Sequence, residues 1–314
     1  ALLTLAAALC LLVWLVPLPR PFVLGACFAL IGAFLSSTPP FQNAMAMDAN
    51  RCGIPVVYGF CRGVGSVSYA AAVLLLGFVL ERHAPTLLLP VFAALTACGL
   101  LAMSGFRLPE RPDEAADRPA ERRSIAAVLR SHPRFALTLL GCMFFFLTHT
   151  ISNTYMNALV GKAGGTASAV GTSLAISAVL ELPAMTLVSR LQKRFSPGFF
   201  LRFAAGAEVV KFLIFYLARS MPLIYLGHCM QFFQFAVYAP ATVYYVAAAL
   251  PERDQLKGQS LIYVAGSGLG GALGNLLGGR LLDRSGIQAA LLLGTVSAAA
   301  SLLTFCLSTR EDSR

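Results

Sequence analysis

The sequence predicts an all-α polytopic membrane protein built from two helical bundles, and three observations carry this prediction. Hydrophobic residues make up 57% of the 314 residues, whereas Asp, Glu, Lys and Arg together make up only 12%. A typical soluble domain has roughly 25% charged residues. The apolar runs are about 20 residues long, which is the length that a helix needs to cross the hydrocarbon core of a bilayer. A single long charged segment interrupts these runs.

We expect ten membrane spans, four before and six after that charged segment. Segment 107–134 contains seven Arg and five acidic residues, and such a composition cannot bury a core, so it predicts a solvated linker. The chain then divides into an N-terminal bundle at 1–106, the linker at 107–134 and a six-helix C-terminal bundle at 135–314. The expected spans, with soft boundaries, are 1–17, 22–42, 57–80, 85–106, 135–158, 166–189, 199–218, 222–250, 258–282 and 286–308.

The distribution of basic residues predicts the orientation of these spans. If segment 107–134 is cytoplasmic, sixteen Lys and Arg fall on the cytoplasmic side and six on the outer side, as the positive-inside rule expects. The C-terminus is then also cytoplasmic, and we expect a bacterial cytoplasmic membrane. The net charge of +10 is therefore interpreted as loop charge and not as a nucleic-acid surface. The chain opens with Ala inside an apolar run, so we expect its beginning to be missing.

Enzyme and metal signatures are missing from the sequence. It has no GxSxG, HExxH or Walker A motif, and its eight cysteines are scattered without a CxxC pair. We therefore expect no enzymatic activity, no cofactor, no metal site and no disulfide framework. The glycines Gly266, Gly270, Gly274 and Gly278 repeat every four residues, which places them on one helix face where another helix can approach closely.

Charged side chains inside the predicted spans are the main functional candidates. Arg62, Glu181 and Lys211 lie within spans, and Glu208 lies one turn before Lys211. Each such charge costs at least about 2.5–3.5 kcal/mol at the bilayer centre, so these residues usually face a bundle interior or a water-filled cavity. Structural interpretations stay open beside the functional one. Arg62 could snorkel to the interface, and Lys211 could pair with Glu208 on one helix face.

Glu181 has no partner within its own span. Desolvation disfavours the ionised form of a carboxylate, so an isolated acid of this kind can exchange a proton. An interhelical hydrogen bond is the structural alternative. Around Arg62, small residues favour a helix packed among other helices: Gly59, Gly63, Gly65 and Ser66.

Amide side chains in the spans can hydrogen-bond a hydroxylated solute, or they can bond neighbouring helices. Gln231 and Gln234 are three residues apart and share a helix face, Gln42 follows a Pro-Pro pair, and Asn153 lies in the fifth span. Both interpretations of these residues remain open from the sequence.

The arrangement of spans around a charged central loop resembles the major facilitator superfamily, which has twelve helices in two sets of six. The likeness covers essentially the whole chain and implies that two N-terminal helices are absent. Within the superfamily, YGFCRGVGSVSYA resembles the fifth-helix motif of lactose-permease-like proton symporters. The resemblance implies a substrate-binding role for Arg62 and a proton-coupling role for Lys211. KGQSLIYVAGSGLGGALGNLLGGRLLDRSG also resembles the eleventh helix of that family.

The resemblance also implies site positions for the other polar residues, with departures from the pattern. Gln231 and Gln234 fall on a His-x-x-Glu pair, and Gln42 falls near a substrate-contacting glutamate, so three titratable groups have become amides. Glu181 falls about a turn from a family glutamate on the eighth helix. Because amides cannot titrate, Glu181 is the best remaining proton carrier in this pattern.

From these observations we expect a monomeric secondary active transporter that moves a small polar organic solute (sugar-like, nucleoside-like or an organic acid) by alternating access, coupled to protons. The expected partners are the solute, the lipid bilayer and protons, with no nucleic acid. An uncoupled facilitator, a non-transporting membrane scaffold or sensor, and a five-plus-five carrier are the alternatives. The expected substrate-binding residues are Arg62, Gln42, Asn153, Gln231 and Gln234, and the expected proton-coupling residues are Glu181, Lys211 and Glu208.

Overall fold

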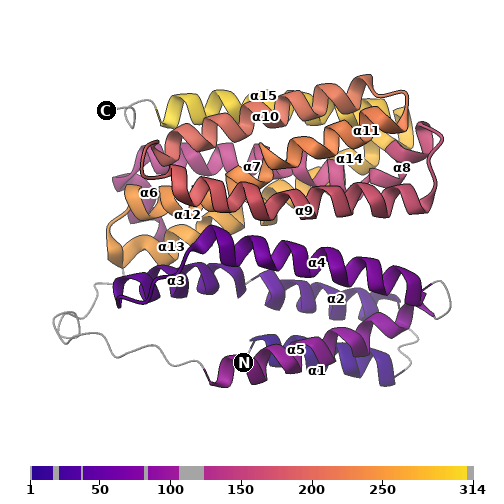
Figure 1. The fold of residues 1–314 in the computed structure, drawn as a ribbon, viewed down its shortest axis with the longest axis horizontal. Helices are drawn as coiled ribbons and strands as arrows, with labels where there is room; N and C mark the ends of the chain where they lie inside the picture. Colours follow the sequence, from indigo (N-terminus) through magenta and orange to yellow (C-terminus); the bar gives the residue numbers. More distant parts are fainter. Residues whose placement is uncertain (1, 17–20, 37, 81–83, 106–123, 310–314) are drawn as a thin grey trace. The chain divides into compact units, whose positions relative to one another are not determined.

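The computed structural model describes residues 2–16, 21–36, 38–80, 84–105 and 124–309, and every regular element in these ranges is helical (Figure 1). The chain divides into two compact units. One comprises Ala1–Val56 with Leu75–Ala120, and the other comprises Val57–Leu74 with Glu121–Arg314. Helix α4, Tyr58–Leu80, therefore contributes its first part to the second unit. Most of the predicted linker, 106–123, lies outside the described residues.

The first unit contains short apolar helices. Helix α1 packs against α2 and α5, and α2 packs against α3. The expected span 22–42 is covered by two helices, α2 and α3, because a new helix begins at Thr38 just before the Pro39-Pro40 pair, and proline is tolerated in the first turn of a helix. The bounds are α1 Leu2–Leu15, α2 Pro21–Ser36, α3 Thr38–Arg51, η1 Pro85–Leu87 and α5 Leu88–Ser104.

After the linker, the second unit continues with a short helix, α6, Ile125–Ser131. The side chain of Ser124 caps this helix by accepting a hydrogen bond from the Ala127 amide, 3.2 Å long. The end of the segment expected as a solvated linker is therefore helical. The helices that follow are α7 Pro133–Thr154, α8 Met156–Lys162, α9 Ala167–Leu191, α10 Pro197–Leu217, α11 Met221–Cys229, η3 Met230–Phe232, α12 Phe235–Ala249, α13 Glu252–Tyr263, the π-helical segment η4 Val264–Gly270, α14 Gly271–Ser285 and α15 Ile287–Ser308.

Six helical stretches in the described ranges are long and apolar enough to cross a membrane. They are Phe22–Asn50, Pro133–Thr154, Ala169–Leu191, Met221–Ala249, Glu252–Ser285 and Ile287–Ser308. Helix α10 has the required length at 21 residues, but it carries the three charges Arg202, Glu208 and Lys211. The expectation of a polytopic all-α membrane protein is confirmed.

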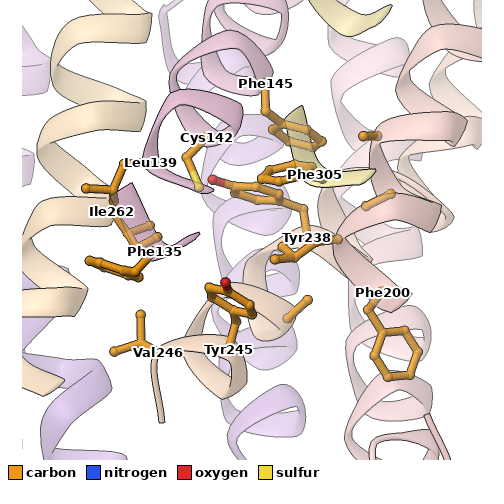
Figure 2. Packing of buried hydrophobic residues seen from close by; sticks show 14 of the residues in the cluster. Phe135, Leu139, Cys142, Phe145, Phe200, Tyr238, Tyr245, Val246, Ile262 and Phe305 are labelled. Carbon is orange, nitrogen blue, oxygen red and sulfur yellow. The ribbon is translucent and has the colours of Figure 1, made fainter. Parts of the chain in front are cut away.

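The two largest apolar clusters among the described residues form most of the core of the second unit, and we call them the larger and the smaller apolar cluster. Figure 2 shows the larger one, in which the rings of Phe145 and Tyr238 stack with their centroids 3.9 Å apart and Cys142 lies beside them. Its buried members are Val128, Phe135, Leu139, Cys142, Phe145, Val188, Phe200, Leu201, Ala204, Ala205, Val237, Tyr238, Ala241, Tyr245, Val246, Leu250, Ile262 and Phe305. Those of the smaller cluster are Leu147, Ile151, Met156, Leu159, Val160, Phe212, Phe215, Ala218, Ile224, Ile287, Ala290 and Leu291.

The predicted glycine face packs closely, as the sequence indicates, and its partner is α7. A Cβ atom on Gly270 would lie 2.3 Å from the backbone oxygen of Met143, and one on Gly274 would lie 2.7 Å from that of Leu147. A Cβ atom on Gly266 would lie 2.7 Å from the ring of Phe146, which also belongs to α7. The run spans the π-helical segment and α14. Gly266, Gly268 and Gly271 form a G-x-G-x-x-G pattern within it, but this pattern lies in a helix and not in the strand-to-helix turn of a dinucleotide-binding site.

Candidate polar site in the second unit

A break in one membrane span places two amide side chains in the interior of the second unit. The span 222–250 was expected to be continuous, but its first helix, α11, ends at Cys229. The short segment η3 follows, and the next helix, α12, begins at Phe235. Gln231 lies in η3, and Gln234 directly precedes α12 with φ −100° and ψ −94°, outside the helical region. Interrupted helices of this kind bring polar groups to the midplane of transporters.

A hydrogen-bonded chain of four side chains crosses this break. The Lys211 Nζ atom donates to Gln231 Oε1 at 2.8 Å, and Gln231 Nε2 donates to Glu181 Oε1 at 2.9 Å. The Ser66 hydroxyl donates to the other oxygen of Glu181. Lys211, Gln231, Glu181 and Ser66 are all buried, and they come from α10, η3, α9 and α4. We call this set the polar chain.

Glu208 takes a different partner from the one that its spacing suggests. Gln234 Nε2 donates to Glu208 Oε1 at 3.0 Å, and both side chains are 0% exposed. Lys211 donates instead to Gln231, and the described residues contain no direct ion pair between Lys211 and Glu208. The intrahelical pair considered from the i, i+3 spacing is therefore wrong as a direct contact, because each charged group finds an amide on the neighbouring broken helix.

Two of the charged residues of α10, Glu208 and Lys211, lie between the two apolar clusters along the helix. Upstream on this helix, Phe200 and Leu201 belong to the larger cluster, and downstream Phe212 and Phe215 belong to the smaller one. Glu208 and Lys211 occupy the intervening turns of the 21-residue helix. We call Glu208, Gln234 and the polar chain together the polar layer. Along α10, this layer separates two apolar regions.

Lys211 also contacts an aromatic ring. Its ammonium lies 5.7 Å from the centroid of the Phe215 ring, within the range of a cation–π interaction. His228 is also buried, and its ring nitrogens contact Ser177 Oγ at 2.9 Å and Met156 Sδ at 3.0 Å. The sequence predicted no role for His228, because nothing in the local pattern distinguishes a functional histidine from one that only packs in the interior.

Arg62 lies on the same helix as Ser66, one turn earlier, and its side chain is half-buried. It forms no hydrogen bond or ion pair with any residue in the ranges that the structure describes. The small residues around it pack as expected against α9. The Gly59 amide donates to Ser189 Oγ at 3.0 Å, and a Cβ on Gly63 would lie 2.6 Å from the Leu182 Cα.

Asn153 and Gln42, the remaining predicted binding residues, lie outside the polar chain. Asn153 is exposed on α7, and its Nδ2 atom contacts His149 Nε2 at 3.1 Å. The His149 ring stacks on Phe235, next to Gln234, with centroids 4.4 Å apart. Gln42 belongs to the first unit, where it lines a cavity of about 310 Å³ with mainly apolar neighbours.

Sequence reasoning identified most members of the site but gave Ser66 no polar role. Ser66 is separated from Glu181 by 115 residues, and a single serine in a small-residue stretch carries no signal of that contact. His149 has a stronger signal, because it lies four residues before Asn153 on the same helix face. Chemically, the site offers one ammonium, two carboxylates and two amides in a buried layer.

Known proteins show the same fold and family. A family model described as the MFS_1 like family matches residues 1–293. A maltose permease of Geobacillus stearothermophilus is 28% identical over 286 residues, covering 90% of this chain and 71% of the permease. The crystal structure of the E. coli fucose:proton symporter FucP matches with a TM-score of 0.62 at 16% identity, covering 98% of this chain and 81% of that one.

A crystal structure of a variant of the nucleoside transporter NupG matches with a TM-score of 0.64 at 18% identity, covering 98% of this chain and 81% of that one. At this level of identity the two solved structures show the fold alone. The family-model match, by contrast, covers most of the chain, and it agrees with the helical architecture and the apolar spans. The chain belongs to the MFS_1 like family of the major facilitator superfamily of multi-pass membrane transporters.

Proposed function

We propose that this protein is a monomeric, proton-coupled secondary transporter that moves a small polar organic solute by alternating access. In this proposal the protein resides in a bacterial cytoplasmic membrane, with 107–134 and the C-terminus on the cytoplasmic side. The observation that carries the proposal is the polar chain from Lys211 through Gln231 and Glu181 to Ser66 at a helix break. Buried ionisable groups in a membrane protein are costly and mark substrate or ion pathways.

Arg62 supports the solute-binding part of the proposal. Its guanidinium carries five N–H donors and no acceptor, and none of these donors is engaged by a described residue. Arg62 lies one turn from Ser66, so it can hold a hydroxylated solute beside the polar chain. Asn153, with His149 and Phe235, offers amide and ring surfaces near Gln234. A solute-binding role for Gln42, in the first unit, stays a prediction.

Charge counting supports the coupling part of the proposal. The buried layer contains two carboxylates, Glu181 and Glu208, and one ammonium, Lys211. With all three ionised the layer would carry one uncompensated negative charge, which is strongly disfavoured away from water. One proton bound to a carboxylate removes this excess, and this charge balance supports a site that binds a single proton.

Relatives suggest which probes to use. The similar maltose permease, fucose:proton symporter and nucleoside transporter bear names that point to sugars and nucleosides. Purified 314-residue chain in proteoliposomes should take up radiolabelled maltose, fucose or uridine, faster when the outside is more acidic than the inside. Lys211→Met should abolish this uptake, whereas Lys193→Met, which alters an exposed lysine after α9, should leave it unchanged.

Three outcomes separate the alternatives. Uptake that ignores proton and sodium gradients would identify an uncoupled facilitator, consistent with two amides that cannot titrate. Absence of binding for all three probes, in a chain that purifies with its helical content intact, would refute transport of these solute classes and favour a scaffold. If Glu181→Gln leaves gradient-driven uptake intact, Glu181 is not the proton carrier.

A further inference from the structure

Two buried oxygen atoms in the polar layer lack hydrogen-bond donors, and they belong to side chains that already touch. Glu208 on α10 accepts a hydrogen bond from Gln234 Nε2 at 3.0 Å. The second oxygens of this pair, Glu208 Oε2 and Gln234 Oε1, are both buried without a partner in the described part of the chain. An ionised carboxylate and an amide oxygen are both acceptors, so neither can satisfy the other.

We propose that Glu208 is protonated in this conformation and forms a doubly hydrogen-bonded acid–amide pair with Gln234. The proposal deepens the transport function proposed above by naming the group that holds the coupled proton. A proton on Glu208 Oε2 converts that atom from an acceptor into a donor, and its O–H group then donates to Gln234 Oε1. The existing bond from Gln234 Nε2 to Glu208 Oε1 is unchanged. One proton therefore satisfies both unpaired atoms.

The hydrogen bonds around Glu181 indicate the opposite protonation state for that residue. An ammonium only donates, so Lys211 requires the oxygen of the Gln231 amide, and the Gln231 nitrogen must then face Glu181. The Ser66 hydroxyl donates to the remaining oxygen of Glu181. With a donor on each oxygen, Glu181 is arranged as a carboxylate whose charge balances Lys211. A neutral Glu208 then leaves the whole buried layer without net charge.

The titratable groups around Glu208 supply no competing donor in the described residues. Lys211, on the same helix, is within electrostatic reach but donates to the polar chain. Tyr238 of the adjacent α12 is also within electrostatic reach, but its hydroxyl donates no hydrogen bond to Glu208, whose Oε2 atom has no partner among the described residues. On α11, His228 is held by two other side chains. Helix α15 contributes only Cys306, and η3 contributes no titratable residue.

The test is the infrared carbonyl band of a protonated carboxylic acid, measured near neutral pH on the purified chain in lipid. The parent should show this band, Glu208→Gln should lose it, and Glu181→Gln should keep it. Gln234→Leu should retain the band but shift it to higher wavenumber, because the acid carbonyl loses its hydrogen bond. This variant keeps the acid in place, so the assignment can be tested even if Glu208→Gln does not fold.

Three results would overturn the proposal: no acid band in the parent near neutral pH, a band that disappears in Glu181→Gln but persists in Glu208→Gln, or a band unaffected by Gln234→Leu. A sodium-specific rise in thermal stability that Glu208→Gln removes would also overturn it, because the unpaired oxygens would then be ligands of a cation. None of these measurements needs a transported solute. Failure of the uptake assay and failure of this inference are therefore distinguishable.

Discussion

The contact between the glycine face and α7 makes a quantitative prediction for Gly270→Ala. Gly270 and Gly271 have nearly the same backbone conformation, with φ and ψ of −60° and −44° against −62° and −46°. An added Cβ lies 2.3 Å from the Met143 backbone oxygen at Gly270, but 3.6 Å from the Thr150 side chain at Gly271. Since 3.4 Å marks ordinary contact, Gly270→Ala must move the two helices apart by about 1.1 Å.

The matched variant isolates the cost of that displacement. Both substitutions gain the same helix propensity, about 0.8–1.0 kcal/mol for alanine over glycine. Overpacking of this kind costs about 1–3 kcal/mol, and each kcal/mol changes the midpoint of thermal unfolding by about 2–4 °C. Gly270→Ala should therefore unfold about 2–12 °C below Gly271→Ala, as followed by circular dichroism in detergent. Equal midpoints for the two variants would refute the close approach of η4 to α7 at Gly270.

Three further substitutions follow from single contacts. Tyr245→Phe removes the hydroxyl that accepts a buried hydrogen bond of 3.0 Å from Thr138, and it should lower the free energy of unfolding by about 1 kcal/mol in denaturant titrations. A loss below the error of the titration would contradict this. Arg202→Gln breaks two 2.6 Å contacts to Thr309 at the end of α15, so hydrogen exchange should accelerate in the last turn of α15 and not in its first. Gly59→Leu inserts a side chain where α4 meets α9, and exchange at the start of α4 should rise; unchanged protection there would argue against the contact.

Sequence patterns predicted the spans well because length and hydropathy decide whether a helix crosses a bilayer. They also predicted the glycine face, because a four-residue repeat can be read from a single stretch of sequence. The break at Gln231 and Gln234 escaped prediction because the apolar run continues through it. The two prolines of this span lie away from the break, Pro222 in the first turn of α11 and Pro240 inside α12.

The partners within the site were harder to predict than its members. Spacing paired Glu208 with Lys211, and local geometry alone would allow that contact. The outcome depends on two amides twenty or more residues away, which offer each charged group a hydrogen bond in the correct direction. Ser66 is more distant still. Such partners follow from helix packing, which the sequence of a single span does not encode.

The complete enclosure of Glu208 has a kinetic consequence. A carboxyl group at 0% exposure, with apolar clusters upstream and downstream on its helix, has no aqueous contact through which to exchange. Its equilibration with bulk solvent therefore requires a rearrangement of the helices around it. In the proposed proton-coupled transport, the apolar clusters would insulate the layer against proton leak, and the opening rate of the protein would set an upper limit on the rate of transport.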